Sequence, residues 1–205
     1  MNPKITILLA THNRAHLIEE TLASIRSQTY ENWECLIVDD FSTDQSESVI
    51  REFIKNDERF SYFIKTKEYS RGLSGTRNFG LDLAEERGAR YIQFFDDDDI
   101  MHPRKLELQV SPLIYNKDLD LTLCCYRKFE NWDTIDFDLE KSNDGSCNIY
   151  SKNLLKSFFL NQLSLNSPGP LWKASVILKY RFHEDLFYGE ERELYLRIFL
   201  NENLK

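Results

Sequence analysis

Apolar runs typical of buried strands alternate with helix-like segments through the first 117 residues of this chain. The expected strands end at polar residues and cover residues 5–10, 33–38, 60–64 and 91–95. Apolar residues recur at helical spacing between them; Asp44 and Glu47 fit a capping box, and Gly88 is placed to close a helix. Such alternation is typical of βαβ units, so the sequence predicts an α/β fold with a mainly parallel central sheet.

The second half of the chain has looser patterning. The apolar run over residues 119–126 predicts a further strand, and residues 131–146 are rich in polar and turn-forming types. Residues 167–172 indicate a rigid loop that presents Trp172, and residues 191–199 predict a helix that ends almost at the terminus. We expect a single domain, either minimal or cut before a C-terminal segment, whose second half is built on the same sheet.

The composition limits the class of protein. A 41% apolar and 13% aromatic content argues against disorder, and a net charge of −8 without a Lys/Arg-rich tract argues against a nucleic-acid partner. The N-terminus has no signal-peptide pattern, and no apolar run approaches the roughly 20 residues that cross a bilayer. We therefore expect no transmembrane segment, while peripheral membrane contact stays open.

The cysteines indicate reduced thiols. Cys124 and Cys125 are adjacent, which is poor geometry for a disulfide, and neither Cys35 nor Cys147 completes a C-x-x-C spacing. We expect structural cysteines in a cytosolic compartment.

Four consecutive aspartates, Asp96 to Asp99, follow the fourth expected strand. Two carboxylates about 4 Å apart repel each other by roughly 4 kcal/mol at an effective dielectric near 20, so the cluster needs solvent, protons or a cation. Oxygen ligands suit Mg²⁺ or Mn²⁺, and ligands of open α/β sheets bind outside the carboxyl ends of the strands, where Asp96 and Asp98 would project. A solvated acidic turn is the alternative.

A glycine-rich loop over residues 70–75 precedes the third expected helix, with Arg71 and Arg77 beside it. Free N–H groups at a helix start favour anions, so either arginine could steady a nucleotide or its phosphates. The alternative for Arg77 is a hydrogen bond to a loop. No Gly-Lys-Ser/Thr sequence follows, so the loop is not a P-loop.

Acidic pairs also stand after the second strand and before the last helix, at Asp39-Asp40 and Glu190-Glu191, so that three acidic sites outline a cleft. Five segments in order resemble the motifs of the family 2 glycosyltransferases of the GT-A fold: residues 7–14, 38–44, 71–80, 94–103 and 189–197. The resemblance implies one α/β/α sandwich over residues 1–205. Within it, residues 1–117 would bind the nucleotide sugar and residues 118–205 would face the acceptor.

The resemblance also implies an activity. A hexosyltransferase of this family would move a monosaccharide from a nucleoside-diphosphate sugar, here expected to be a UDP-sugar, to an acceptor hydroxyl with inversion at the anomeric carbon. The expected acceptor is a saccharide or a lipid-linked saccharide in bacterial-type surface polysaccharide or glycoconjugate synthesis. The expected location is the cytoplasm, at most peripheral to the inner face of the membrane.

Roles on the donor side follow from the matched motifs. Asp39 would accept a hydrogen bond from the nucleotide base, with polar helix capping as the alternative. Asp98 would hold Mn²⁺ or Mg²⁺ at the donor diphosphate, and Asp96 would bind the metal or the ribose. The other residues expected to bind nucleotide are Ala10, Thr11, Asn13, Arg71, Arg77 and Asp97.

Glu191 stands at the position of the family's catalytic base, which would take the proton of the acceptor hydroxyl. The chain departs from the family pattern here, because the family carries Asp; an acidic first helical turn is the alternative. Glu190 and Trp172 are expected near the acceptor or its sugar, although a core tryptophan is the commoner outcome. His102 and His183 have no partner at metal-binding spacing and are expected to be ordinary histidines.

Two other classes fit parts of the pattern. A phosphatase of the haloacid dehalogenase type also carries a D-x-D after a strand, but near its chain start, whereas three strands precede Asp96 here. A nucleotide-sugar-binding module without catalysis would fit the presence of Glu191 and the early end of the chain. Nucleotide binding without turnover on any acceptor would favour the module.

Overall fold

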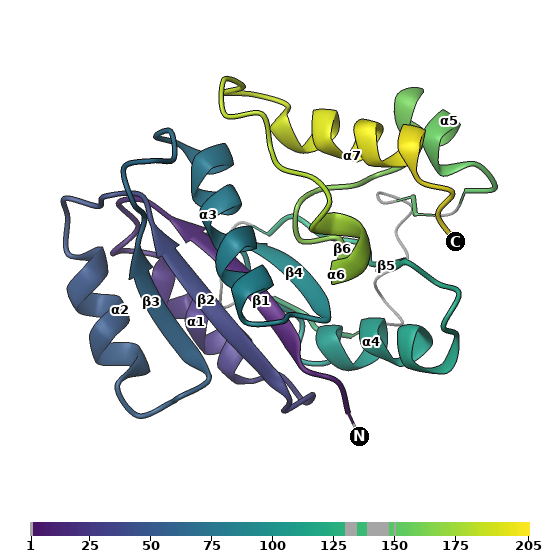
Figure 1. The fold of residues 1–205 in the computed structure, drawn as a ribbon. Helices are drawn as coiled ribbons and strands as arrows, with labels where there is room; N and C mark the ends of the chain where they lie inside the picture. The colour runs from purple at the N-terminus through teal and green to yellow at the C-terminus, as the bar shows by residue number, and fades with distance from the viewer. Residues whose placement is uncertain (1, 130–134, 139–147, 150) are drawn as a thin grey trace.

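The computed structural model describes residues 2–129, 135–138, 148–149 and 151–205. Within these residues, six strands form one sheet in the spatial order β3-β2-β1-β4-β6-β5 (Figure 1). The four mutually parallel strands are β1 (Ile5–Thr11), β2 (Trp33–Asp39), β3 (Phe60–Ile64) and β4 (Tyr91–Asp96). Strand β6 (Pro170–Lys173) runs antiparallel to both of its neighbours, β4 and β5 (Leu121–Leu123). The predicted α/β fold with a mainly parallel sheet is confirmed.

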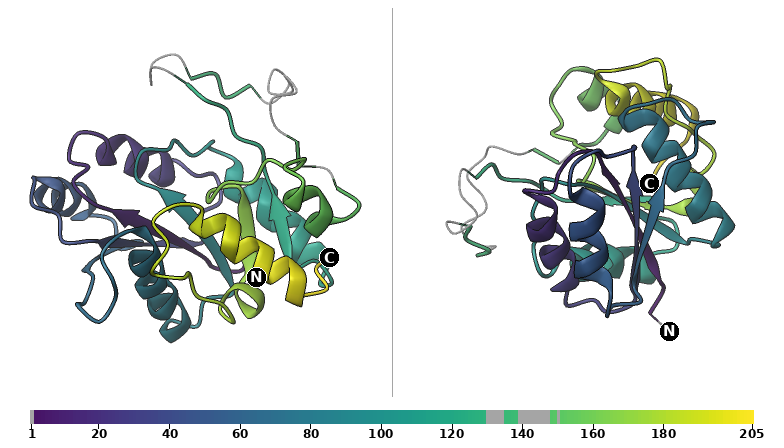
Figure 2. Two further views of the ribbon diagram at one scale, coloured as in Figure 1. Left: turned by 90° about the horizontal axis from the view of Figure 1, so that it is seen from above. Right: turned by 90° about the vertical axis from the view of Figure 1, so that its left-hand side faces the viewer.

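Helices cover both faces of this sheet (Figures 1 and 2). The helices on one face are α1 (Ile18–Arg26), α2 (Ser46–Ile54) and α4 (Lys105–Tyr115). Those on the other face are α3 (Leu73–Glu86), α6 (Ala174–Ile177) and α7 (Glu190–Asn201), with α5 (Leu154–Phe159) packed on α7. The chain therefore builds an α/β/α sandwich.

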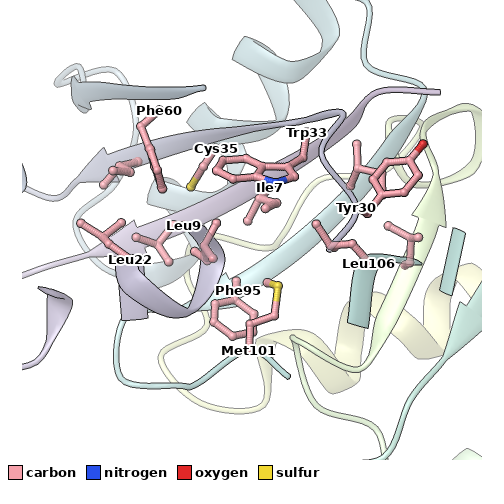
Figure 3. Packing of buried hydrophobic residues seen from close by; sticks show 14 of the residues in the cluster. Ile7, Leu9, Leu22, Tyr30, Trp33, Cys35, Phe60, Phe95, Met101 and Leu106 are labelled. Carbon is pink, nitrogen blue, oxygen red and sulfur yellow. The ribbon is translucent and has the colours of Figure 1, made fainter. Parts of the chain in front are cut away.

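The alternation of side chains along each strand divides the core in two. On β1, Ile7 and Leu9 point into one cluster and Leu8 points into the other. Both faces are buried, which is why the central strands are mostly apolar in sequence. Figure 3 shows the first cluster, whose labelled members are Ile7, Leu9, Leu22, Tyr30, Trp33, Cys35, Phe60, Phe95, Met101 and Leu106. Burial of each such large side chain contributes about 1.5 to 3 kcal/mol.

Helix α3 ends where the sequence predicts. Gly88 has a φ of +66°, its N–H donates to the carbonyl of Glu85, and the next N–H, of Ala89, donates to the carbonyl of Ala84. This pair of hydrogen bonds with a left-handed residue is a Schellman motif, which favours glycine. The stop sends the chain directly into β4.

The predicted capping box at the second helix is wrong. Helix α2 begins at Ser46, and the carboxylate of Asp44 accepts hydrogen bonds from the N–H groups of Ser46 and Ala15 instead. Glu47 forms an ion pair with Arg51 at 2.8 Å, one turn further along the helix. Asp44 therefore ties the start of α2 to the loop after β1, a long-range contact that a local pattern does not reveal.

The second half adds its strands to the same sheet, as expected, but with different bounds. Strand β5 covers three residues of the predicted run, and β6 forms where a loop was predicted. Pro170 is tolerated because it is the first residue of β6. Helix α7 starts at Glu190 and extends to Asn201, beyond its predicted end.

The described residues also show the state of two cysteines and the character of the helices. Cys35 and Cys124 are free thiols, whereas Cys147 and most of residues 131–146 lie outside the described residues. In the described part of the chain, no helix combines the length and the apolar character needed to cross a membrane.

Candidate active site

The carboxyl ends of β1, β2 and β4 and the start of α3 surround a cavity of about 460 Å³. Strand β1 pairs with β2 on one side and with β4 on the other, so the cavity lies where the order of strands reverses. Open α/β sheets bind ligands at such switch points. The lining residues are Ala10, Thr11, His12, Arg14, Asp40, Gly72, Leu73, Thr76, Asp96, Asp97 and Asp98.

The loop after β1 supplies one wall of the cavity. Ala10 and Thr11 line it, as their predicted role requires. Asn13 does not line it: this residue has a φ of +53°, and its Oδ1 accepts a hydrogen bond from the N–H of Thr43 at 2.7 Å. Its own N–H donates to Ser42 Oγ at 2.9 Å. Asn13 therefore holds the loop after β2 in place and lies outside the cavity lining, so its predicted contact with a nucleotide stays a prediction.

The structure separates the roles of the two aspartates at the end of β2. Asp39 is buried and outside the cavity lining; its Oδ1 accepts from the N–H of Ser42 at 2.6 Å and its Oδ2 from the hydroxyl of Tyr62 at 2.7 Å. This hydrogen bond and burial raise the pKa of the Tyr62 hydroxyl far above its usual value, burial contributing most. Asp39 is thus a structural residue, and the predicted contact between Asp39 and a nucleotide base does not fit its position.

Asp40 borders the cavity instead. Its Oδ1 lies 2.5 Å from the ammonium of the buried Lys65, and its Oδ2 accepts from the N–H of Gly72 at 2.6 Å. Gly72 has a φ of +100° at the cap of α3, a backbone conformation that suits glycine. These contacts fix the carboxylate at the rim while leaving it lone pairs for a further donor.

The aspartates after β4 are partly neutralised by arginines. Asp96 Oδ1 lies 2.8 Å from Nη2 of Arg77, and Asp97 Oδ1 lies 3.2 Å from Nε of Arg14. Arg14 also approaches Asp98, with its Nη2 3.6 Å from Oδ2. The Asp98 side chain is 47% exposed and faces the cavity that it lines. Arg14 was part of a matched segment but had no predicted role.

The donor set fits a divalent cation that is shared with a phosphate ligand. Burial, followed by the charges of Asp96 and Asp98, raises the pKa of Asp99 to about 7. Among the described residues, no three His, Cys, Asp or Glu side chains are grouped to hold a metal alone. Mg²⁺ and Mn²⁺ typically take one or two carboxylates and complete their shell with phosphate and water, which Asp98 and Asp96 allow.

Arg77 connects this cavity to the first turn of α7. Its side chain is 3% exposed, and its Nη1 lies 2.8 Å from Oε1 of Glu191 and 3.7 Å from Oε1 of Glu190. Burial by itself lowers the pKa of Arg77, but the charges of Asp96 and Glu191 outweigh burial and raise that pKa above its usual value. One buried guanidinium therefore bridges the aspartate cluster and the glutamate pair.

Glu191 has a second partner in the hydroxyl of Ser167, which donates to its Oε1. Ser167 is buried in the turn before β6, a contact that the sequence analysis did not identify. The side chain of Glu191 remains 28% exposed, against 13% for Glu190. Glu191 is thus oriented by two groups and still reachable from solvent.

Trp172 and Arg71 lie outside the cavity lining. Trp172 is fully buried in β6, with its ring 5.5 Å from that of Tyr195, so it belongs to the core and does not stack on a sugar. Arg71 is exposed and outside the lining of the cavity, unlike its neighbour Gly72. His183 lies 3.4 Å from Glu193, away from the aspartates that surround the cavity.

The family sequence model described as "Glycosyl transferase family 2" matches residues 6–170. The chain belongs to this family. The match begins inside β1 and ends at the start of β6, so it includes every strand that contributes to the cavity. Membership of this family also excludes the alternative that the aspartate motif belongs to a phosphatase of the haloacid dehalogenase type.

The names of two relatives of this family member describe glucosyltransferases that act on undecaprenol-linked glycans. The chain is 38% identical over 55% of its length to UDP-Glc:alpha-D-GlcNAc-diphosphoundecaprenol beta-1,3-glucosyltransferase WfgD of Escherichia coli. It is 28% identical over 96% of its length to GalNAc(5)-diNAcBac-PP-undecaprenol beta-1,3-glucosyltransferase of Campylobacter jejuni. The chain spans 42% and 60% of the lengths of these two proteins.

Solved structures support the fold of this family 2 member. Residues 1–349 of TarS from S. aureus superpose with a TM-score of 0.72 and 21% identity, covering 98% of this chain and 56% of that one. The mannosyltransferase PcManGT from Pyrobaculum calidifontis, solved with GDP-Man and Mn²⁺, gives a TM-score of 0.67 at 18% identity, covering 97% and 52%. The predicted GT-A fold is confirmed.

Proposed function

We propose that this family 2 glycosyltransferase transfers a hexose, with inversion, from a UDP-sugar to a hydroxyl of a lipid-linked saccharide. The observation that carries the proposal is the connection from the cavity at Asp98 and Asp96 through the buried Arg77 to Glu191. A donor site and a candidate base are thereby held within one ion-pair network. The bacterial relatives with undecaprenol-linked acceptors support a role in surface polysaccharide or glycoconjugate synthesis at the inner face of the membrane.

On the donor side, the base and the diphosphate of the nucleotide would meet different residues of the cavity lining. Asp40 would accept a hydrogen bond from the base, because its carboxylate is fixed at the rim by Lys65 and Gly72. Asp98 and Asp96 would hold Mn²⁺ or Mg²⁺ at the diphosphate. The cation, when bound, neutralises negative charge that grows on the diphosphate as it leaves.

On the acceptor side, Glu191 would act as the general base. The acceptor oxygen attacks the anomeric carbon while its proton passes to a carboxylate oxygen of Glu191, and the bond from that carbon to the diphosphate oxygen breaks with its electron pair leaving on UDP. A single displacement of this kind inverts the configuration at the anomeric carbon. Arg77 and Ser167 fix the direction of the Glu191 carboxylate.

UDP is expected to stabilise the protein strongly only together with Mn²⁺ or Mg²⁺. At a free UDP concentration about 100 times the dissociation constant, mass action adds about 2.7 kcal/mol to the free energy of unfolding. The measurement is a thermal-shift titration with UDP, Mn²⁺, both, or UDP in chelator. Equal stabilisation in chelator would exclude the role of the cation, and no stabilisation by UDP, GDP or their sugars would exclude the donor site.

The corrected assignment at the end of β2 gives a matched pair of variants. Asp40→Asn is expected to weaken uridine binding by about 1 to 3 kcal/mol, because the cavity loses a charged acceptor. Asp39→Asn changes the adjacent residue in the same way but lies outside the cavity lining, so it should alter stability while sparing uridine affinity. Calorimetry with uridine and urea unfolding of both variants check this. The reverse ranking of affinities would return the role to Asp39.

A further inference from the structure

Two neighbouring aromatic side chains project into solvent just before helix α7. Phe187 is 79% exposed and Tyr188 is 92% exposed, whereas Phe94 and Tyr195 are almost completely buried. Gly189, with a φ of +71°, follows them as the cap of α7. Contiguous exposed apolar surface, unlike rings exposed singly, is a feature of ligand and partner sites.

The loop that carries these rings is fastened to the donor site. Glu184 accepts hydrogen bonds from the N–H of Ser70 at 2.6 Å and from Nδ2 of Asn78 at 2.9 Å. Ser74 Oγ donates to the carbonyl of Leu186 at 3.4 Å. The segment between α6 and α7 therefore runs beside the start of α3 (Figures 1 and 2).

The other end of the loop leads directly into the glutamate pair. Gly189 is followed by Glu190 and Glu191, whose carboxylates are held by Arg77. Phe187 and Tyr188 thus lie in the short stretch between Leu186, which contacts Ser74 of α3, and the start of α7, which carries Glu191. In the sequence, the two rings stand four and three positions before Glu191, the carboxylate that would meet the acceptor hydroxyl.

We propose that Phe187 and Tyr188 form a platform that binds a hexose ring of the acceptor and so determines acceptor specificity. The inference rests on the proposed function, since it concerns the substrate that meets Glu191. Sugars have an apolar C–H face that packs on an aromatic ring, and aromatic side chains provide large contact area with few rotatable bonds to order. The buried Trp172 cannot serve in this way.

The charges around the platform favour a sugar over a membrane surface as its occupant. Glu184 and Asp185 precede the two rings, and Glu190, Glu191 and Glu193 follow them. Anionic lipid headgroups attract basic segments, so an acidic surrounding opposes insertion of these rings into such a surface. A neutral saccharide meets no such repulsion, and the carboxylates can accept hydrogen bonds from its hydroxyl groups.

The test is saturation-transfer NMR with methyl β-glycosides of glucose, galactose, N-acetylglucosamine and N-acetylgalactosamine, in the presence of UDP and Mn²⁺. The wild-type protein is expected to bind at least one of these probes. The variant with both Phe187→Ala and Tyr188→Ala should bind it at least about tenfold more weakly, a typical loss for aromatic contacts. The single variant Tyr188→Phe should keep most of the wild-type affinity, because the face of the ring is retained.

Tyr115→Ala is the matched control, because Tyr115 is 89% exposed at the end of α4. It should bind the probe as the wild type does. Unchanged affinity in the double variant, or no probe bound by the wild type, overturns the inference. The inference is also overturned if the double variant binds the sugar probe as the wild type does but no longer binds vesicles of phosphatidylglycerol and phosphatidylcholine.

The thermal shift by UDP and Mn²⁺ separates this inference from the proposed function. An intact shift in the double variant shows that the donor site is folded, so a loss of probe binding then reflects the platform alone. If the double variant loses the thermal shift, the single variant Tyr188→Ser is compared with the wild type in the same two measurements, because it changes less of the structure. Absence of the shift in the wild type would instead contradict the proposed function.

Discussion

Replacing Glu191 by glutamine is expected to lower single-turnover sugar transfer by about 10² to 10⁴, because an amide cannot take the proton of the acceptor hydroxyl. UDP and cation binding should stay nearly unchanged, since Glu191 does not line the donor cavity. Glutamine keeps the length of the side chain and an oxygen that can still accept from Ser167. The measurement pairs single-turnover transfer from a UDP-sugar with the thermal shift by UDP and Mn²⁺.

Two further variants make this result specific. Glu190→Gln alters the adjacent carboxylate, which is less exposed and lies 3.7 Å from Arg77, and it should cost much less activity. Glu191→Asp restores the residue of the family motif and should retain substantial activity. An inactive Glu190→Gln would move the base one position earlier. Full activity of both glutamine variants would place the base elsewhere, and UDP binding without any transfer by the wild type would favour the binding module.

The second large effect is expected at Asp98. Asp98→Asn should remove most of the cation-dependent stabilisation by UDP, because the half-exposed carboxylate that faces the cavity is lost. The variant should fold at least as stably as the wild type without ligand, since the substitution relieves repulsion with Asp96 and Asp99. Thermal shifts with UDP over a series of Mn²⁺ concentrations, and Mn²⁺ binding followed by electron paramagnetic resonance, measure both effects.

Asp97→Asn is the matched control for this substitution. Asp97 carries the same charge one residue earlier, but its carboxylate is engaged by Arg14 at 3.2 Å and by the N–H of His12 at 3.4 Å. The variant should therefore keep most of the Mn²⁺ dependence. If Asp97→Asn abolishes the dependence while Asp98→Asn leaves it intact, Asp97 is the metal ligand.

The buried position of Arg77 explains how the two halves of the site are held together. A buried cation is costly unless it is paired, and Arg77 has carboxylates from β4 and from α7 on its two sides. The strand that ends in the aspartates and the helix that carries Glu191 are far apart in sequence. Their common partner fixes the spacing between Asp96 and Glu191.

The predictions that succeeded concern periodic segments. The first four strands and the helices between them formed where apolar spacing indicated, because burial on both faces of a parallel sheet requires continuous apolar runs. Asp96 and Asp98 line the cavity, and their position at the end of β4 follows directly from the apolar pattern of that strand. Strand β6 was missed, because its few residues become a strand only through pairing with β4 and β5.

The sequence itself determined the succession of strands and helices along the chain and the position of the aspartates at a strand end. Side-chain periodicity and burial are properties of each local segment. The tertiary structure decided which of Asp39 and Asp40 faces the cavity, since adjacent residues at a strand end point to opposite sides and only the packed neighbours Tyr62 and Lys65 distinguish those sides. It also decided that Trp172 is core and that Arg77 bridges Asp96 to Glu191. These outcomes depend on contacts between residues distant in the chain, which no local pattern contains.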